Sequence, residues 1–289
     1  MKIALGTAQF GLNYGVSNVS GQVKTPEVRS ILKEAIKYNI DTLDTAIVYG
    51  SSEKILGKVG VGQFNIVTKL PPIPKNINDI DSWVTNHVKS SLDRMSIKSI
   101  SRLLLHRSAD LIETPNNKLF ESLHRLKDLG VVDKVGVSIY DPEELDALED
   151  CGIRVDIVQA PFNIIDRRLE TSGWINKLKQ TGVELHTRSV FLQGLILQKE
   201  EQRSPYFDTW KDYFDKLSEW IKDTKQTSLS ASLNFLYFNT EIDKVIVGVQ
   251  NKNQLVEILN SISDIHNFLI PRDLMIDDPM LINPTNWKL

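Results

Sequence analysis

Cysteine is nearly absent from the sequence: Cys151 is the single cysteine among 289 residues, so no disulfide can form within the chain. Such sparing use of cysteine is typical of proteins kept in a reducing compartment. No run approaches the roughly 18 apolar residues of a membrane span, and the N-terminus lacks the apolar core and cleavage site of a signal peptide. These absences together predict a cytoplasmic protein that has no membrane partner.

An excess of charge of one sign is also missing. The chain has 34 Lys and Arg against 37 Asp and Glu, a formal net charge of -3, and it offers no basic footprint for nucleic acid. Its five histidines lack the paired spacing of metal ligands, and the sequence contains neither a P-loop nor a G-x-S-x-G motif. We therefore expect no nucleic-acid partner and no metal site, while the oligomeric state stays open.

What the chain does contain is a regular alternation of short β-branched runs with longer segments of helical period. The expected strands cover residues 2–8, 41–46, 64–70, 101–107, 133–139, 155–161, 183–190 and 244–250. The expected helices cover residues 25–39, 51–58, 81–95, 116–130, 141–152, 172–182, 204–224, 228–239 and 252–262. Alternation of this kind predicts parallel strands joined by right-handed crossovers.

Eight such units in 289 residues fit a single (β/α)8 TIM barrel domain over residues 1–289, an α/β fold with its active site at the C-terminal mouth. The segment between the last two strands holds two helices where one would suffice. A doubly wound open sheet is the alternative fold, although no G-x-G-x-x-G follows the first strand.

Residues 25–39 show in detail how one of these helices is expected to form. Thr25 is the expected N-cap, and Pro26 is the expected first helical residue. Apolar residues at i, i+3 and i+4 spacing define one buried face. That face consists of Val28, Ile31, Leu32, Ala35 and Ile36.

Four polar residues stand where a barrel would place reactive groups, at the C-terminal ends of strands and on the following loops. Asp44, Lys69 and His106 end the second, third and fourth strands, and Tyr49 follows the second. Singly, an Asp here can cap a helix, a Lys can reach solvent and a His can pack in the core. Together, Asp44 and Lys69 would be partly buried at adjacent strand ends, so we expect them to pair.

A tyrosine beside this pair gains acid–base chemistry. A free phenol titrates near roughly 10, and a neighbouring ammonium favours the phenolate, so Lys69 is expected to lower the pKa of Tyr49. Such a tyrosine can donate a proton to a carbonyl oxygen, while a neutral His106 holds the carbonyl in place. The hydride for the same reduction would come from a nicotinamide.

These motifs also carry a family resemblance. The stretches "DTLDTAIVYGSSEKILG", "IVTKL" and "LLLHR" resemble the signature of the aldo-keto reductase family, and the resemblance runs from "LGTAQFG" to "IVGVQNKNQLVEIL". It implies a barrel that binds NADPH across its mouth and reduces an aldehyde, ketone or keto-sugar to an alcohol. It also implies that Asp44, Tyr49, Lys69 and His106 form the catalytic tetrad, with Tyr49 as the proton donor.

The resemblance further implies a set of cofactor contacts. The expected set is Gly6, Thr7, Ala8, Asp44, Ser138, Gln159, Arg188, Ser189, Phe191, Gln193, Gly194, Gly248, Gln250, Gln254, Glu257 and Ile258. Ile139 replaces an Asn that usually binds the carboxamide. The helix after the last strand lacks the usual basic residues for a 2'-phosphate, although Lys252 is near. NADPH is the expected cofactor, and NADH is the alternative.

Arg188 stands where many relatives have a Tyr that stacks on the nicotinamide. Two interpretations stay open. The guanidinium can lie over the ring and disfavour its oxidised, cationic form, or it can turn outward to hold a phosphate or an anionic substrate.

The first loop, residues 6–21, is long and rich in Asn, Gly and Ser. Phe10, Asn13 and Tyr14 are expected to overhang the mouth and to contact the substrate together with Tyr49 and His106. With Gln9, Gln193 and Arg188 they predict a polar pocket for a hydroxylated or anionic molecule.

The sequence style resembles the branch of the family found with bacterial surface-sugar biosynthesis, which points to a sugar derivative. The alternative function is a catalytically weak NADP(H)-binding regulatory or sensor protein of the same fold.

Overall fold

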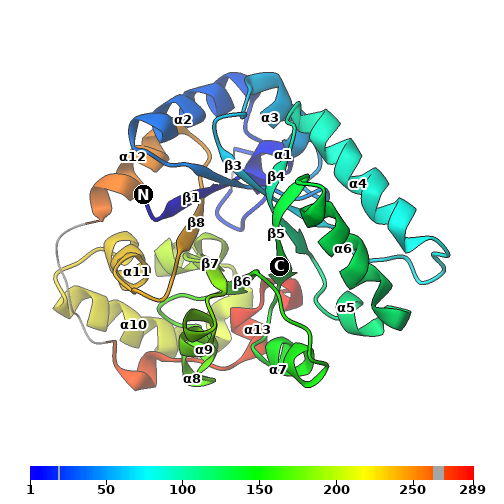
Figure 1. The fold of residues 1–289 in the computed structure, drawn as a ribbon. Helices are drawn as coiled ribbons and strands as arrows, with labels where there is room; N and C mark the ends of the chain where they lie inside the picture. Colours follow the sequence, from blue (N-terminus) through cyan, green and yellow to red (C-terminus); the bar gives the residue numbers. More distant parts are fainter. Residues whose placement is uncertain (19, 263–269) are drawn as a thin grey trace.

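The computed structural model describes residues 1–18, 20–262 and 270–289. Within them, eight parallel strands follow one another around a closed barrel, and β1 pairs with β8 to complete it (Figure 1). The strands are β1 (Ile3–Gly6), β2 (Thr42–Asp44), β3 (Asn65–Leu70), β4 (Ile100–Leu105), β5 (Val132–Ser138), β6 (Ile157–Pro161), β7 (Glu184–Arg188) and β8 (Lys244–Gly248). The predicted (β/α)8 barrel is confirmed.

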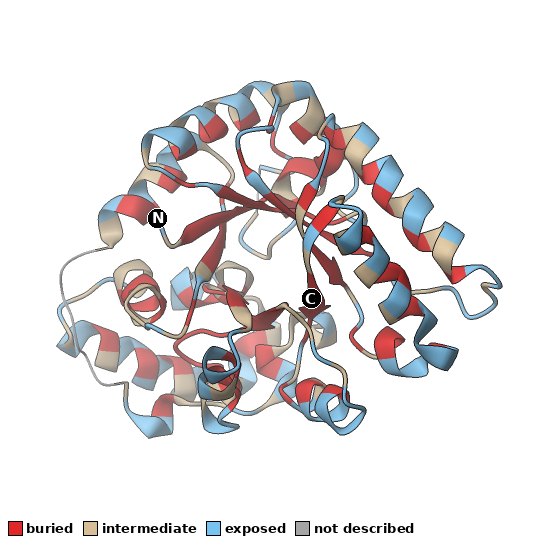
Figure 2. Ribbon diagram, in the orientation of Figure 1, coloured by how far each residue is buried: buried red, intermediate tan, exposed pale blue. Residues whose placement is uncertain are grey.

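The longer helices surround the barrel on the outside, whereas α1 (Ala8–Gly11) lies in the loop after β1 (Figure 1). The helices are α1, α2 (Thr25–Lys37), α3 (Ser52–Val59), α4 (Ile80–Met95), α5 (Asp110–Glu113), α6 (Lys118–Asp128), α7 (Glu143–Asp150), α8 (Arg168–Thr171), α9 (Trp174–Gln180), α10 (Lys211–Asp223), α11 (Ser228–Tyr237), α12 (Lys252–Ser261) and α13 (Pro279–Ile282). The two helices predicted between the last strands are α10 and α11. Figure 2 shows the strands largely buried and the helices buried on one side only.

Helix α2 shows which parts of the local prediction fail. Its residues Val28, Ile31, Leu32 and Ala35 are buried, as predicted from their spacing. Ile36 is 47% exposed, because it lies beyond the edge of this stripe. Thr25 is already helical and Lys24 is the N-cap, so the predicted capping role of Thr25 is wrong. Extended backbone at Lys24 leads directly into a first turn that contains Pro26.

The interior of the barrel is closed below the strand ends. Val67, Leu104 and Ile157 form a buried apolar cluster separate from the main core. Nearer the N-terminal ends, Arg102 of β4 donates to Glu184 of β7 at 2.9 Å. Because β4 and β7 are not neighbours in the sheet, this ion pair crosses the interior. The polar groups at the C-terminal ends therefore stand on a filled barrel.

A second apolar cluster lies beside the barrel. It joins the loop after β7, helices α10 and α11 and the C-terminal segment, and includes Leu195, Phe214, Leu274 and Leu281. Polar contacts support this packing, since the Tyr213 hydroxyl donates to the Leu274 carbonyl at 2.9 Å.

In the part of the chain that the structure describes, no helix combines the length and the apolar character needed to cross a membrane.

Candidate active site

The C-terminal ends of the strands surround a cavity of about 680 Å³. All the predicted cofactor contacts line it, together with Tyr49, His106 and Tyr14. They come from strand ends and loops spread along the chain from β1 to α12, and the alternation of strands and helices brings them together. Lys69 does not reach the cavity surface, because it is 1% exposed beneath it.

Asp44 and Lys69 form the pair that their adjacent strand ends predict. The Lys69 Nζ atom lies 2.7 and 2.8 Å from the two carboxylate oxygens of Asp44 and also donates to the Thr45 carbonyl at 2.9 Å. Gln159 donates its amide N–H to the same carboxylate at 2.7 Å. Both charged groups are buried, so each depends on the other for compensation.

Tyr49 lies against this pair, with its ring centroid 5.3 Å from the Lys69 ammonium. Burial raises the pKa of Tyr49, the Asp44 carboxylate raises it further, and Arg188 acts in the opposite direction. The expectation of a lowered pKa at Tyr49 is therefore wrong. The ammonium is matched by Asp44 and offers the phenol no net positive charge. Tyr49 is therefore protonated at neutral pH.

His106 packs against Tyr49, with ring centroids 6.0 Å apart and planes at 79°. Burial, followed by the nearby Lys69 charge, lowers the pKa of His106 to about 4. The imidazole is therefore neutral at physiological pH. Its Nδ1 atom is buried and has no hydrogen-bond partner among the described residues. A neutral ring at this position can donate a hydrogen bond to a carbonyl oxygen without adding charge.

Arg188 points across the end of β5. Its guanidinium donates to the Ile139 carbonyl at 2.9 Å and to the Ser189 hydroxyl at 3.3 Å. The ring of Tyr140 lies beneath it, 4.3 Å from centroid to guanidinium carbon. Sequence reasoning missed Tyr140, although its position in the loop after β5, two residues beyond Ser138, was a signal that could have identified it.

The predicted roof of the mouth is partly wrong. Phe10 is fully buried in the main core, because the chain forms the short helix α1 directly after β1 and turns this side chain inward. Asn13 is exposed and does not line the cavity. Tyr14 does line it.

Further cavity residues that the sequence did not indicate are Gly15, Ser17, Val190, Leu197, Lys199, Thr227, Ser228, Leu229, Ile246 and Val247.

Some lining residues of the cavity suit a phosphate. Lys199 lines it, and so do Thr227 and Ser228, which begin helix α11. A lysine and a helix N-terminus both favour a bound anion. The part lined by Gln250, Gln254 and Glu257 differs, since none of its lining residues on α12 is basic. There the Gln254 side chain instead accepts a hydrogen bond from the Gln250 N–H at 2.8 Å.

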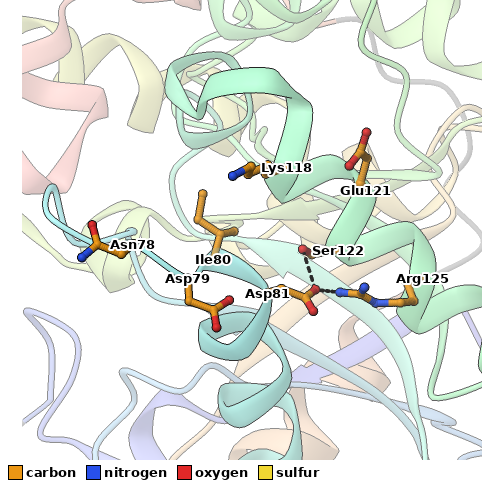
Figure 3. A pocket seen from close by; sticks show the side chains of 8 residues that line it. All are labelled: Asn78, Asp79, Ile80, Asp81, Lys118, Glu121, Ser122 and Arg125. Atoms are coloured by element: carbon orange, nitrogen blue, oxygen red, sulfur yellow. Dashed lines mark hydrogen bonds and ion pairs between the residues drawn. The ribbon is translucent and has the colours of Figure 1, made fainter.

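A second, smaller cavity of about 250 Å³ lies between the start of α4 and α6 (Figure 3). Two of its charged side chains, Asp81 and Arg125, form an ion pair, and Asp81 also accepts a hydrogen bond from Ser122 at 2.9 Å. None of the predicted site residues lines it. Among the described residues there is also no group of three or more His, Cys, Asp or Glu side chains that could hold a metal ion.

The chain is similar to several known proteins. The L-glyceraldehyde 3-phosphate reductase of Escherichia coli strain K12 is 22% identical over 88% of this chain and 84% of that protein. The oxidoreductase sirO of Leptosphaeria maculans is 26% identical over 72% of this chain, which spans 65% of that protein. The holo structure of an aldo-keto reductase from Bacillus halodurans superimposes with a TM-score of 0.74 at 19% identity, covering 92% and 88% of the two chains.

The aldo/keto reductase family model matches residues 2–267, nearly the whole chain. The fold agrees with this match, since the solved relative has the same architecture at low identity. The protein belongs to the aldo/keto reductase family.

Proposed function

We propose that the protein is an NAD(P)H-dependent oxidoreductase that reduces the carbonyl of an aldehyde or ketone to an alcohol, with Tyr49 as the proton donor. The observation that carries this proposal is the protonated Tyr49 lying over the buried Asp44–Lys69 pair and against a neutral His106. Proton donors and an uncharged hydrogen-bond donor at one point suit a reacting carbonyl oxygen. The family and its oxidoreductase members support the same reaction class.

In the proposed mechanism each site residue has a separate role. His106 orients the carbonyl oxygen by a hydrogen bond, and Tyr49 gives that oxygen its proton. Asp44 and Lys69 hold the base of the site rigid, because each is fixed by several hydrogen bonds. A bound reduced nicotinamide supplies the hydride. Ser138 and Gln159 would hold its carboxamide, whereas Ile139 is buried and its side chain offers no hydrogen bond.

The proposed cofactor is NADPH, as the family resemblance implies, and NADH is the alternative. The α12 side of the cavity supports the alternative, because Gln250, Gln254 and Glu257 provide no positive charge for a 2'-phosphate. Lys199 and the start of α11 would hold the diphosphate in either form.

The proposed substrate is a small polar carbonyl compound such as a sugar derivative. A relative named as an L-glyceraldehyde 3-phosphate reductase supports this class. We further propose that residues 1–289 act as one cytoplasmic domain.

A carbonyl panel tests this function. The purified protein is mixed with NADPH or NADH, and the loss of the reduced cofactor is followed with aldehydes, ketones and keto-sugars. Turnover that disappears in Tyr49→Phe, with cofactor binding retained, supports the reductase. Tight cofactor binding without turnover of any carbonyl would instead favour the regulatory or sensor alternative.

A further inference from the structure

Arg188 places a positive charge at the reactive end of the cavity that no acid among the described residues matches. Among the described residues, no carboxylate lies within ion-pair distance of its guanidinium, although the side chain is half-buried. Two other partly buried arginines differ. Arg102 and Arg168 have side-chain exposures of 19% and 15%, and each holds a carboxylate. Partly burying a charge without a partner is unfavourable, so binding of an anionic ligand beside Arg188 would be favourable.

The guanidinium is held in one orientation. It donates to the Ile139 carbonyl and stacks on the ring of Tyr140, and these two contacts leave further N–H donors free. The backbone of Tyr140 is itself held by hydrogen bonds at its N–H and at its carbonyl. Its N–H donates to Glu144 at 2.7 Å and its carbonyl accepts from Arg168 at 3.0 Å. A donor group fixed before binding loses little entropy when a ligand arrives.

Arg188 also lies within electrostatic reach of the reacting groups. Its charge lowers the pKa of both Tyr49 and His106. Asp44 neutralises Lys69, so Arg188 is the uncompensated cation among the described groups that surround the phenol. The rings of Tyr14 and Tyr140 line the same cavity and carry hydroxyl donors. The reactive end therefore combines a carbonyl-binding point with a nearby anion-binding point.

We propose that Arg188, supported by Tyr140, binds a carboxylate or phosphate group of the substrate, so that the protein selects anionic carbonyl compounds over neutral ones of the same size. This inference rests on the proposed carbonyl reduction. It assigns Arg188 to the substrate rather than to the nicotinamide ring. A planar guanidinium with free donors binds a carboxylate and a phosphate by the same hydrogen-bond chemistry. The matched substrates below distinguish the two groups.

Two substrate pairs test the proposal by kcat/KM. Succinic semialdehyde is compared with butanal, and glyceraldehyde 3-phosphate is compared with glyceraldehyde. We expect one anionic member to exceed its neutral partner by about 10- to 100-fold, the value of one or two charge-assisted hydrogen bonds. Arg188→Gln should reduce that ratio at least tenfold, mainly through KM, and Arg188→Lys should restore only part of it. Tyr140→Ala should weaken the preference by releasing the guanidinium.

Arg154→Gln is the matched control, because Arg154 is exposed on the loop before β6, at the other end of the barrel. It should leave the ratio unchanged. A wild-type ratio near one for both pairs overturns the proposal, and so does a ratio that Arg188→Gln leaves intact.

Direct binding separates this inference from the proposed function. Succinate and inorganic phosphate are titrated calorimetrically against wild type and Arg188→Gln. Weaker binding of either anion to the variant supports the subsite even if no aldehyde is reduced. Equal affinities in the two proteins overturn it, whether or not the neutral aldehydes are turned over.

Discussion

Gly11 at the end of α1 lies directly against the backbone of Tyr49. A β-carbon built on Gly11 would stand 1.8 Å from the Tyr49 carbonyl oxygen and 2.4 Å from the Ser52 nitrogen. Gly50 meets the same contact from the other side, since its β-carbon would lie 2.4 Å from the Gly11 carbonyl oxygen. The first βα loop and the loop that carries the proposed proton donor therefore fix each other's position.

A Gly11→Ala substitution should displace Tyr49 and lower kcat at least tenfold. Overpacking of this kind typically costs about 1 to 3 kcal/mol of stability. The added methyl group would meet backbone atoms, which cannot move aside as a flexible side chain can. Gly62→Ala is the control, because no atom lies within 4 Å of its added β-carbon. Steady-state kinetics and urea unfolding of both variants check the prediction. Full activity in Gly11→Ala would show that this contact does not position Tyr49.

Tyr49→Phe should reduce the rate of carbonyl reduction by about 100- to 10,000-fold, the range typical of general acid catalysis. The ring and its contact with Lys69 remain, so the dissociation constant of the cofactor should stay near its wild-type value. Stopped-flow turnover and fluorescence titration measure the two quantities. A variant that reduces carbonyls at the wild-type rate would remove Tyr49 from the mechanism.

Lys69→Met leaves Asp44 buried with only the Gln159 amide as its described partner. Loss of one member of a buried pair costs about 3 to 5 kcal/mol, so the free energy of unfolding should fall by that amount. The double variant Lys69→Met/Asp44→Asn removes the orphaned charge and should recover part of the loss. Chemical denaturation of the single and double variants compares them. Equal stability of the single variant and wild type would contradict the role of the pair.

The depressed pKa of His106 predicts how stability depends on pH. Its ordinary value of 6.5 falls to about 4 in the folded protein, so the unfolded chain binds a proton first as the pH decreases. Stability from this group is greatest above pH 6.5 and decreases by about 3 kcal/mol as the pH falls to about 4. His106→Gln should lack this part of the slope. Unfolding curves at several pH values test it, and parallel slopes in the two proteins would contradict the assignment.

Gln254→Arg should create the positive charge that α12 does not contribute to the cavity. We expect NADPH to bind about tenfold more tightly to this variant, in line with one charge-assisted hydrogen bond, while the affinity for NADH stays within about twofold. In wild type, the two cofactors should differ by less than about tenfold. Fluorescence titrations with both cofactors measure these ratios, and a strong wild-type preference for NADPH would show that another group holds the phosphate.

The sequence predicts the barrel and the Asp44–Lys69 pair well, for a physical reason. Strand and helix periods extend over many residues, and adjacent strand ends in a parallel barrel bring particular side chains together. The pKa of Tyr49 shifts in the opposite direction from the expectation. Burial and the Asp44 carboxylate raise it, and the Lys69 ammonium is already neutralised by Asp44. The prediction that Phe10 overhangs the mouth is wrong for another reason. A glycine-rich loop does not reveal which of its aromatic side chains turns into the core.

The walls of the large cavity rest on two different apolar clusters. The strand ends and α12 belong to the main core, whereas Leu192 and Leu195, in the loop after β7, belong to the cluster that includes Leu274 and Leu281 of the C-terminal segment. These clusters need not unfold as one cooperative unit. Loosening of the C-terminal segment would therefore loosen the wall formed by the loop after β7 while the barrel stays folded. The affinity for a long ligand and the thermal stability of the barrel would then vary independently.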